Sequence, residues 1–258
     1  MTKIEWTNET WNPVTGCTKI SVGCKNCYAE RMAKRLAGRF GYPRDEPFKV
    51  TLHPERLEEP LHRRKPRMVF VCSMGDLFHE DVPWEFIVEV FLIMARASHH
   101  TYQILTKRPE RMREFCSAEQ FNAGPFKHLW LGVTAENQKA ADERIPILLD
   151  TPAAIRFVSC EPLLGTMDLR RFFLAPNGVP PHHAVVRGLH GEGGQGLDWV
   201  IAGGETGPGA RPMHPDWAHD ICNQCIAVAI PFFFKKMGQG LLTPGYLQIR
   251  EWPQSRRG

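Results

Sequence analysis

Short apolar runs, most of them rich in β-branched or aromatic residues, recur along the chain of 258 residues. The apolar residues in each run are continuous rather than alternating, which is typical of strands buried on both faces of a helix-covered parallel sheet. The runs are Met68–Cys72, Tyr102–Leu105, Leu129–Val133, Ile155–Ser159, Trp199–Ala202 and Ile230–Phe234, with Trp11–Thr15 as a further candidate. The pattern therefore predicts a parallel sheet at the centre of the protein.

Segments with apolar residues at helical spacing lie between these strands. In Pro83–Ala97, for example, Ile87, Phe91 and Met94 fall on one face. Proline cannot donate the backbone hydrogen bond of a helix interior, so Pro146 is expected to end one of the helices. The predicted helices are Lys25–Ala37, Pro83–Ala97, Pro109–Phe115, Gln138–Ile145 and Pro215–Ala229. Strands that alternate with helices predict repeated βα units, in a sheet that is open or curled into a barrel.

Two stretches depart from this alternation. Gly38–Pro66 is rich in proline, arginine and glutamate and is predicted to be an irregular excursion. Leu174–Leu197 is rich in glycine, proline and histidine, and is predicted to be a mobile lid over the site or a disordered insertion. The chain shows no internal repeat and no domain-sized linker. We therefore expect residues 1–258 to form a single domain that carries these two insertions.

Polar residues follow five of the predicted strands, at the carboxyl ends where parallel α/β sheets bind their ligands. Loops are polar in general, so any one of these residues is more readily explained as an ordinary loop residue. Five such ends together predict a functional site along one rim of the sheet. The candidate site residues are Ser73, Met74, Gly75, Asp76, Lys107, Arg108, Thr134, Glu136, Asn137, Glu161 and Glu205.

Composition and charge restrict the class of protein. Hydrophobic residues make up 43% and charged residues 23% of the chain, which is ordinary for a globular protein. The apolar stretch around Phe86–Ala97 is interrupted by charges, and the first ten residues contain no apolar signal core. We therefore expect a cytoplasmic protein without a membrane partner. The net charge of +4 is compatible with a nucleic-acid partner but does not require one.

The eight cysteines are the most informative part of the composition. Cys17, Cys24 and Cys27 form a C-x6-C-x2-C pattern in a glycine-bearing loop before a predicted helix, so their sulfurs can face a common centre. Thiolates favour zinc or an iron–sulfur cluster, and unliganded thiols are the remaining alternative. Zinc requires a fourth ligand, and no other cysteine or histidine is near in sequence. Three cysteines suit a [4Fe–4S] cluster whose fourth iron is open for chemistry.

The other cysteines have a simpler interpretation. Cys222 and Cys225 fall in a helical pattern, three residues apart, so both sulfurs face the core. Buried free cysteines behave as small hydrophobic residues, and we prefer this interpretation to a second metal site. Cys72 and Cys160 at strand ends are expected to pack within the sheet, with a role as ligands as the alternative, because both lie near the proposed site. The seven tryptophans are scattered along the chain and are expected to lie mostly in the core.

The segments WNPVTGC and CKNCYAERMA, together with CSMGDLF, LTKRPER, LGVTAEN, FVSCEPLLG and IAGGETGPGARPMHPDW, resemble the radical S-adenosylmethionine superfamily. The resemblance is closest to a phage- and bacterium-associated group with the C-x6-C-x2-C motif. It implies a partial (β/α)6 barrel, a [4Fe–4S] cluster on Cys17, Cys24 and Cys27, and S-adenosylmethionine on the open iron. The first cysteine gap is longer than the usual three residues, and Asn26 stands where an aromatic residue is common.

The resemblance also implies roles for the strand-end residues. The loop of Ser73, Met74, Gly75 and Asp76 corresponds to the one that binds the methionine amino group, with Asp76 as the carboxylate. Thr134, Glu136 and Asn137 correspond to contacts with the ribose. Lys107 and Arg108 are candidates for the methionyl carboxylate or an anionic substrate, and Glu161 and Glu205 for further substrate or cofactor contacts. A flavodoxin or ferredoxin would supply the electron.

Two functional hypotheses follow. The first is an enzyme that generates a 5′-deoxyadenosyl radical and abstracts hydrogen from an unidentified substrate, with DNA or a nucleotide as candidates. The second is a non-catalytic nucleic-acid-binding protein, stabilised by zinc or a cluster, that uses Arg63–Arg67 and Arg256–Arg257 for phosphate contacts. Acidic residues at the strand ends would repel phosphate, so the sequence favours the enzyme.

Overall fold

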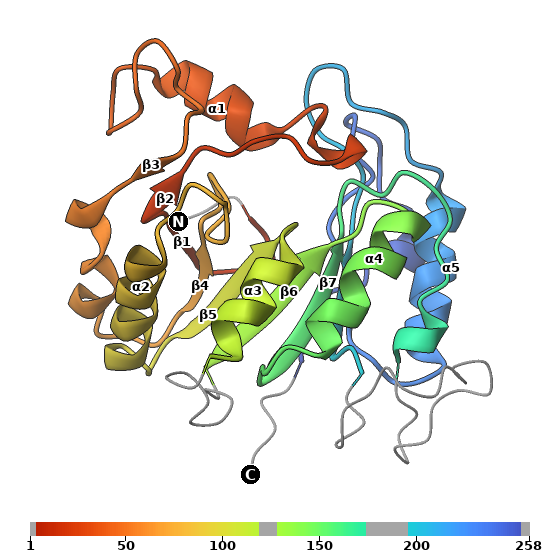
Figure 1. The fold of residues 1–258 in the computed structure, drawn as a ribbon. Coiled ribbons are helices and arrows are strands. Elements are labelled where there is room, and N and C mark those ends of the chain that lie inside the picture. Colours follow the sequence, from red (N-terminus) through yellow and green to blue (C-terminus); the bar gives the residue numbers. More distant parts are fainter. Residues whose placement is uncertain (1–3, 119–127, 174–195, 254–258) are drawn as a thin grey trace.

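A curled sheet of seven parallel strands forms a half-barrel at the centre of the protein (Figure 1). The structure is a computed structural model and describes residues 4–118, 128–173 and 196–253. The sheet order is β1-β4-β5-β6-β7-β8-β9, so successive strands are neighbours. The strands are β1 (Glu9–Trp11), β4 (Met68–Val71), β5 (Thr101–Thr106), β6 (Leu129–Thr134), β7 (Ile155–Cys160), β8 (Trp199–Ala202) and β9 (Phe232–Phe234). The predicted α/β fold with a curled parallel sheet is confirmed.

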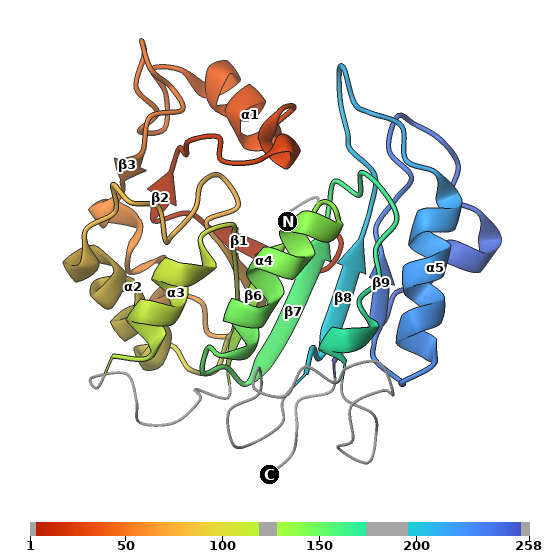
Figure 2. The same cartoon turned by 45° about the vertical axis from the view of Figure 1, so that its right-hand side comes forward.

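Helices cover the outer face of this sheet (Figure 2). They are α2 (Trp84–Arg96), α3 (Pro109–Cys116), α4 (Gln138–Leu149) and α5 (Pro215–Ile226), while α1 (Tyr28–Leu36) lies above the carboxyl ends of the strands. A second, two-stranded antiparallel sheet joins β2 (Val14–Thr15) to β3 (Thr51–Leu52). Short 3-10 helices lie at Val22–Cys24, Pro54–Arg56, Glu59–His62, Arg170–Phe172 and Gly245–Leu247. No helix in the described part of the chain is long and apolar enough to cross a membrane.

Apolar side chains fill both faces of the sheet, as the continuous apolar runs predict. In β4, Val69 and Val71 join the layer beneath the helices, whereas Phe70 points to the inside of the half-barrel. An aromatic cluster fills that inside, and Trp6 packs on Phe70 with ring centroids 4.6 Å apart. The inner cluster consists of Trp6, Phe70, Trp130, Ile155, Phe157, Trp199, Ile201 and Phe233. The prediction that most tryptophans are buried is confirmed for Trp6, Trp11, Trp130 and Trp199.

The predicted strands agree with the structure to within two residues at each end, with one correction. Trp11–Thr15 is not one strand, because Glu9–Trp11 pairs with β4 whereas Val14–Thr15 pairs with β3. Asn12 and Pro13 separate the two, and proline cannot donate a ladder hydrogen bond.

Three predicted helix boundaries were wrong. α1 begins at Tyr28 rather than Lys25, because Cys27 at its N-cap has ψ of 124° and is not helical. α4 continues past Pro146 to Leu149, since buried Leu148 and Leu149 hold its last turn against the core. α5 ends at Ile226 rather than Ala229.

The segment above the carboxyl ends of the strands is here called the cap, and comprises residues 17–49. It contains the three-cysteine loop, α1 and the first part of the predicted irregular excursion. That excursion, Gly38–Pro66, is largely irregular as predicted, with β3 and two 3-10 helices as its only regular elements. The predicted lid or disordered insertion, Leu174–Leu197, lies outside the described residues except for its last two.

Candidate metal centre

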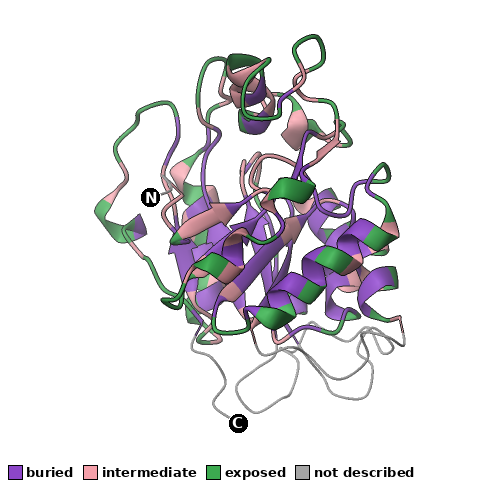
Figure 3. Cartoon of the chain, turned by 90° about the vertical axis from the view of Figure 1, so that its left-hand side faces the viewer, coloured by how far each residue is buried: buried purple, intermediate pink, exposed green. Residues whose placement is uncertain are grey.

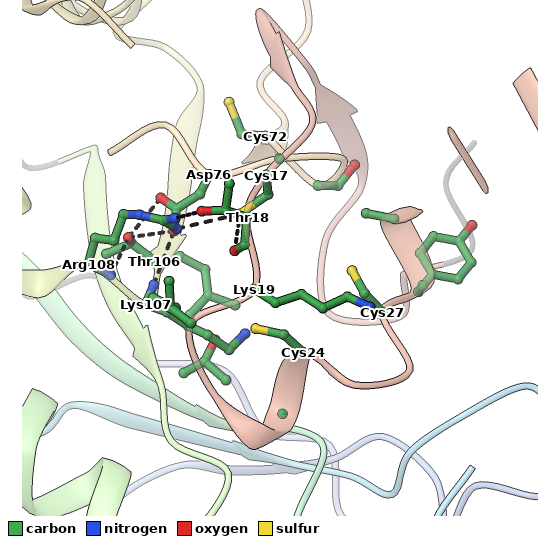
Figure 4. A pocket seen from close by; sticks show the side chains of 18 of the residues that line it. Cys17, Thr18, Lys19, Cys24, Cys27, Cys72, Asp76, Thr106, Lys107 and Arg108 are labelled. Carbon is green, nitrogen blue, oxygen red and sulfur yellow. Dashed lines mark hydrogen bonds and ion pairs between the residues drawn. The ribbon is translucent and has the colours of Figure 1, made fainter. Parts of the chain in front are cut away.

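A cavity of about 220 Å³ opens between the carboxyl ends of the strands and the cap. Cys17, Cys24 and Cys27 all line it, and all three are free and partly exposed. Phe70 and Leu105 from the inner face of the sheet contribute apolar surface to the same cavity. Figure 4 shows the three cysteines around this space, which lies where parallel sheets bind ligands.

Cationic side chains also reach this cavity. The Lys107 side chain extends towards Cys24, and Lys19 crosses between Cys24 and Cys27 (Figure 4). Although burial opposes it, the Lys107 ammonium and hydrogen bonds from the backbone and side chain of Ser21 lower the pKa of Cys24. Burial, assisted by Asp76, raises the pKa of Cys17 to about 11. Among the described residues no carboxylate lies within 4.0 Å of the Lys107 nitrogen, so this cation can serve an anionic ligand.

Arg108 fixes the start of the cysteine loop. Its Nη1 atom donates to Asp76 Oδ2 at 3.2 Å and to Cys17 Sγ at 3.5 Å. Its other nitrogens donate to Thr18 Oγ1 at 2.8 Å and to Glu80 Oε2 at 2.6 Å. Both Asp76 and Arg108 are buried. The guanidinium is thus committed to protein groups, and it joins the loops after β4 and β5 to the cysteine loop.

Asp76 has further partners that hold it in place. Its two oxygens accept hydrogen bonds from Thr106 Oγ1 at 2.8 and 2.9 Å, and the Phe78 and Lys107 backbone nitrogens donate to it at 3.0 and 3.3 Å. The loop of Asp76 is also tied to the residue that follows β1, because Asn12 Oδ1 accepts from Ser73 Oγ at 3.1 Å and from the Met74 nitrogen at 2.9 Å.

Glu136 fixes the middle of the cysteine loop. Only 1% of this residue is exposed, and its Oε2 accepts from Arg144 Nη1 at 2.9 Å. Its Oε1 accepts from the Gly23 backbone nitrogen at 3.3 Å, one residue before Cys24. Despite burial, a hydrogen bond from Ser21 and the charge of Arg144 lower the pKa of Glu136. The carboxylate therefore stays ionised and holds the turn at Gly23.

Glu205 fixes the end of the loop. Its Oε2 accepts from Asn26 Nδ2 at 2.8 Å and from Arg211 Nε at 2.9 Å, and its Oε1 accepts from Arg211 Nη2 at 2.5 Å. Arg211 Nη1 in turn donates to the Val22 carbonyl at 3.0 Å. Arg31 of α1 donates to the Thr206 carbonyl at 2.7 Å. The loop after β8 is thus joined to both the cysteine loop and the first turn of α1.

The structure brings only part of the predicted site to the cavity. The residues that line it are Ser73, Gly75, Asp76, Lys107, Arg108 and Thr134, whereas Met74, Glu136, Asn137, Glu161 and Glu205 are not in its lining. Asn137 caps α4 by accepting from the Ala140 nitrogen at 2.9 Å, and Glu161 pairs with Lys235 at 2.5 Å.

Each of the four strand-end acids therefore has a cationic partner. Asp76 pairs with Arg108, Glu136 with Arg144, Glu205 with Arg211 and Glu161 with Lys235. The expectation that these acids repel phosphate assumes that their carboxylates have no cationic partner, and this assumption was wrong. Charge repulsion at the rim therefore no longer separates the two functional hypotheses.

Sequence reasoning missed the residues that hold the loop, namely Asn12, Thr18, Asn26, Glu80 and Arg211. They lie far apart in the sequence, and no local spacing reveals that they meet. The glycine at position 16 is a clue that the sequence does contain. Its φ is +84°, and a Cβ there would lie 2.1 Å from the Lys49 carbonyl oxygen. Glycine at this position lets the chain turn immediately before Cys17.

The three cysteines share one cavity but do not converge on one point. Within the described ranges, no three histidine, cysteine, aspartate or glutamate side chains are grouped closely enough to hold one metal ion. A structural zinc requires four ligands at about 2.3 Å from one point. The cysteine ligands of a [4Fe–4S] cluster bind different irons, so they surround a space rather than meet at its centre. Cys17, Cys24 and Cys27 line one such space, and lysine and arginine side chains line it beside them.

The other five cysteines are all buried. Cys222 and Cys225 lie on the core side of α5, Cys116 ends α3 and Cys160 ends β7. Cys72, directly after β4, is also buried but lines the same cavity as Cys17, Cys24 and Cys27. Burial raises the pKa of all five thiols, which keeps them protonated. The interpretation of Cys222 and Cys225 as core packing is confirmed.

The fold and the cavity define an α/β half-barrel protein with three free cysteines at the carboxyl end of its sheet. The family model described as "Protein of unknown function (DUF5131)" matches residues 1–245, and the chain belongs to this family. No curated protein and no solved structure matches the chain. The family description states no activity, so a function has to be argued from the site.

Proposed function

We propose that this protein is a radical S-adenosylmethionine enzyme in which Cys17, Cys24 and Cys27 hold a [4Fe–4S] cluster. One observation carries the proposal: three free, partly exposed cysteines line one cavity at the carboxyl ends of a parallel half-barrel. The bound cluster and S-adenosylmethionine would supply a one-electron cleavage that yields a 5′-deoxyadenosyl radical, which takes a hydrogen atom from the substrate. A flavodoxin or ferredoxin would donate the electron.

The residues around the cavity have separate tasks in this proposal. Arg108, Glu136 and Glu205 position the loop that carries the three cysteines, each through the contacts described above. Phe70 and Leu105 exclude water from the inner wall, which protects a reactive radical from side reactions. Lys107 is free of carboxylate partners in the described structure, so it can bind a carboxylate of the cofactor or offset the negative charge of a thiolate-ligated cluster.

The alternative, a non-catalytic zinc- or cluster-stabilised nucleic-acid-binding protein, has less support. Its predicted basic run begins with Arg63, which is paired with Glu9 at 2.8 Å. The rest of that run precedes β4, at the amino ends of the strands and away from the cysteines. Arg256–Arg257 lie outside the described residues.

The proposal is tested by anaerobic reconstitution with iron and sulfide. After reduction and addition of S-adenosylmethionine, we expect cluster absorbance and release of 5′-deoxyadenosine. Replacing Cys17, Cys24 or Cys27 singly with alanine should abolish the cluster. Cys222→Ala is the matched control, because its buried thiol is not in the cavity lining, and it should retain the iron.

Two results would overturn the proposal. One is the absence of cluster absorbance in the wild-type protein, and the other is an intact cluster that never yields 5′-deoxyadenosine. One equivalent of tightly bound zinc in place of iron would instead support the nucleic-acid-binding alternative.

A further inference from the structure

The positive charge of the protein is concentrated in the cap. Residues 17–49 contain eight basic and three acidic residues, a net charge of +5, whereas the whole chain carries +4. The rest of the chain therefore has a net charge of −1. Figure 3 shows the cap as the largely exposed layer above the buried sheet. A concentrated charge of this kind attracts an anionic partner to the cap.

Several of these cations have no acidic partner among the residues that the structure describes. Glu30 pairs with both Lys19 and Lys34, at 2.9 and 2.8 Å. By contrast, the following exposed cations have no carboxylate within 4.0 Å in the described structure: Lys25, Arg35, Arg39 and Arg44. Four unpaired cations on one exposed segment can contact an extended chain of negative charges.

Exposed aromatic side chains accompany these cations. Tyr28, at the start of α1, is 56% exposed and lines the cavity. Phe40 is 72% exposed and follows Arg39 directly. Its φ of +52° lies in the left-handed region, which is rare for a bulky residue. Arg56 Nη2 donates to the Phe40 carbonyl at 2.5 Å and holds this conformation. A strained backbone that keeps an aromatic ring in water points to a contact made with a ligand.

We propose that the substrate of this enzyme is a nucleic-acid strand, which binds across the cap and reaches the cavity at its mouth. As an assignment of substrate, this rests on the proposed function. Phosphodiester groups match the unpaired cations, and bases stack on exposed aromatic rings, a combination typical of single-stranded nucleic-acid sites. An acidic polypeptide is the competing partner, and the competition with poly-L-glutamate described below tests it. The paired acids at the rim present no unbalanced negative charge to the strand.

The binding test uses the full-length, reconstituted protein and fluorescein-labelled oligonucleotides of about 20 nucleotides. Fluorescence anisotropy is measured with single-stranded DNA, duplex DNA and single-stranded RNA, over about 50 to 200 mM salt. We expect saturable binding that weakens as salt rises and that is tightest for a single strand. The arms with DNA and RNA distinguish the two sources of the phosphodiester chain.

Two variants of the cap test its role. Arg35→Ala with Arg39→Ala should reduce the slope of log affinity against log salt by about 1.4, because two phosphate contacts are lost. Phe40→Ala should weaken binding by about fivefold or more through lost stacking. The matched control is Arg64→Ala with Lys65→Ala, which removes two exposed charges at the amino ends of the strands and should leave the affinity unchanged. Thermal unfolding of every variant reports whether it is folded.

Three outcomes would overturn the inference. They are no binding at the lowest salt, equal weakening by the control variant, and equally good competition by poly-L-glutamate, which would show attraction to any polyanion. The oligonucleotide-binding test can fail independently of the test of the proposed function. Formation of 5′-deoxyadenosine without oligonucleotide binding refutes the nucleic-acid substrate alone, and oligonucleotide binding without a cluster refutes the radical chemistry.

Discussion

Replacing Glu205 with glutamine tests whether the loop after β8 holds the cysteines in place. The Glu205 carboxylate is 5% exposed and accepts hydrogen bonds from Asn26 and Arg211. Glutamine has nearly the same shape but carries no charge, and its amide nitrogen would face the donors of Arg211. The substitution therefore leaves a partly buried guanidinium without its anion and loosens the turn between Cys24 and Cys27.

The size of the effect follows from the pKa of this carboxyl. Although burial opposes ionisation, the hydrogen bonds from Arg211 and Asn26 lower the pKa of Glu205 to about 2. An ordinary glutamate has a pKa of about 4.3, and each pH unit corresponds to about 1.4 kcal/mol. The native contacts therefore favour the carboxylate by about 3 kcal/mol. Because the folded pKa is the lower one, this stabilisation is present above pH ~4.3 and is lost as the pH falls towards 2.

Urea denaturation at neutral pH measures the loss of stability directly. We expect Glu205→Gln to lower the free energy of unfolding by about 2 kcal/mol, since glutamine keeps one acceptor, and to lower the iron bound after reconstitution. Glu89→Gln on α2 is the matched control, because Glu89 is exposed and unpaired in the described structure, and it should change stability by less than about 0.5 kcal/mol. A Glu205→Gln protein with wild-type stability and full iron content would refute this account of the loop.

Two further predictions concern the fold. A Cβ at Gly132 would lie 2.5 Å from the Phe157 ring, so Gly132→Ala should cost about 1–3 kcal/mol in thermal or urea unfolding. Gly165→Ala, where no atom lies within 4 Å of the new carbon, should be nearly neutral, and equal effects would contradict the packing argument. Burial lowers the pKa of four histidines, so their protonation opposes folding and stability should fall as the pH drops below about 6.5. The four histidines are His53, His79, His100 and His128. The free energy of unfolding measured between pH 7.5 and 5.5 checks this prediction, and a stability that does not change over that range would contradict it.

The strands were predictable because each is buried on both faces. A strand such as Ile155–Cys160 needs apolar residues on both sides, so its sequence contains a continuous signal. The end of α4 was not predictable from its sequence, because buried apolar contacts outweigh the local cost of Pro146 inside the helix. The break between β1 and β2 at Asn12 and Pro13 was also not predictable, because the sequence does not show that the chain leaves one sheet there and enters another.

The site was predictable in its position but not in its internal connections. The spacing of the three cysteines and the rule for carboxyl ends led to one cavity, which the structure contains. The carboxylates at the strand ends were misleading, because the sequence does not show whether a charged loop residue faces a ligand or pairs with a charged side chain of the protein itself. Glu205 and Asn26 are 179 residues apart in the sequence, and only the folded chain reveals that they form a hydrogen bond.

Arg108 is the residue for which the two interpretations differ most clearly. By resemblance it is a candidate for binding a carboxylate of the cofactor, whereas in the structure it joins Asp76, Glu80 and Thr18 to Cys17. Lysine in its place keeps the charge but has a single nitrogen, which cannot reach all four partners at once. If Arg108 positions the loop, Arg108→Lys should lower the iron content and destabilise the protein by about 1–2 kcal/mol.

If Arg108 instead binds the cofactor, Arg108→Lys should retain its iron and lose only affinity for S-adenosylmethionine. Arg113→Lys on α3, the helix that follows Arg108, is the matched control, because its pair with Asp150 is 3.7 Å long and both side chains are more than 40% exposed. Such surface pairs contribute little, so the control should behave as wild type. Full iron content in Arg108→Lys, together with weak binding of S-adenosylmethionine, would refute the positioning role and restore Arg108 as a ligand-binding residue.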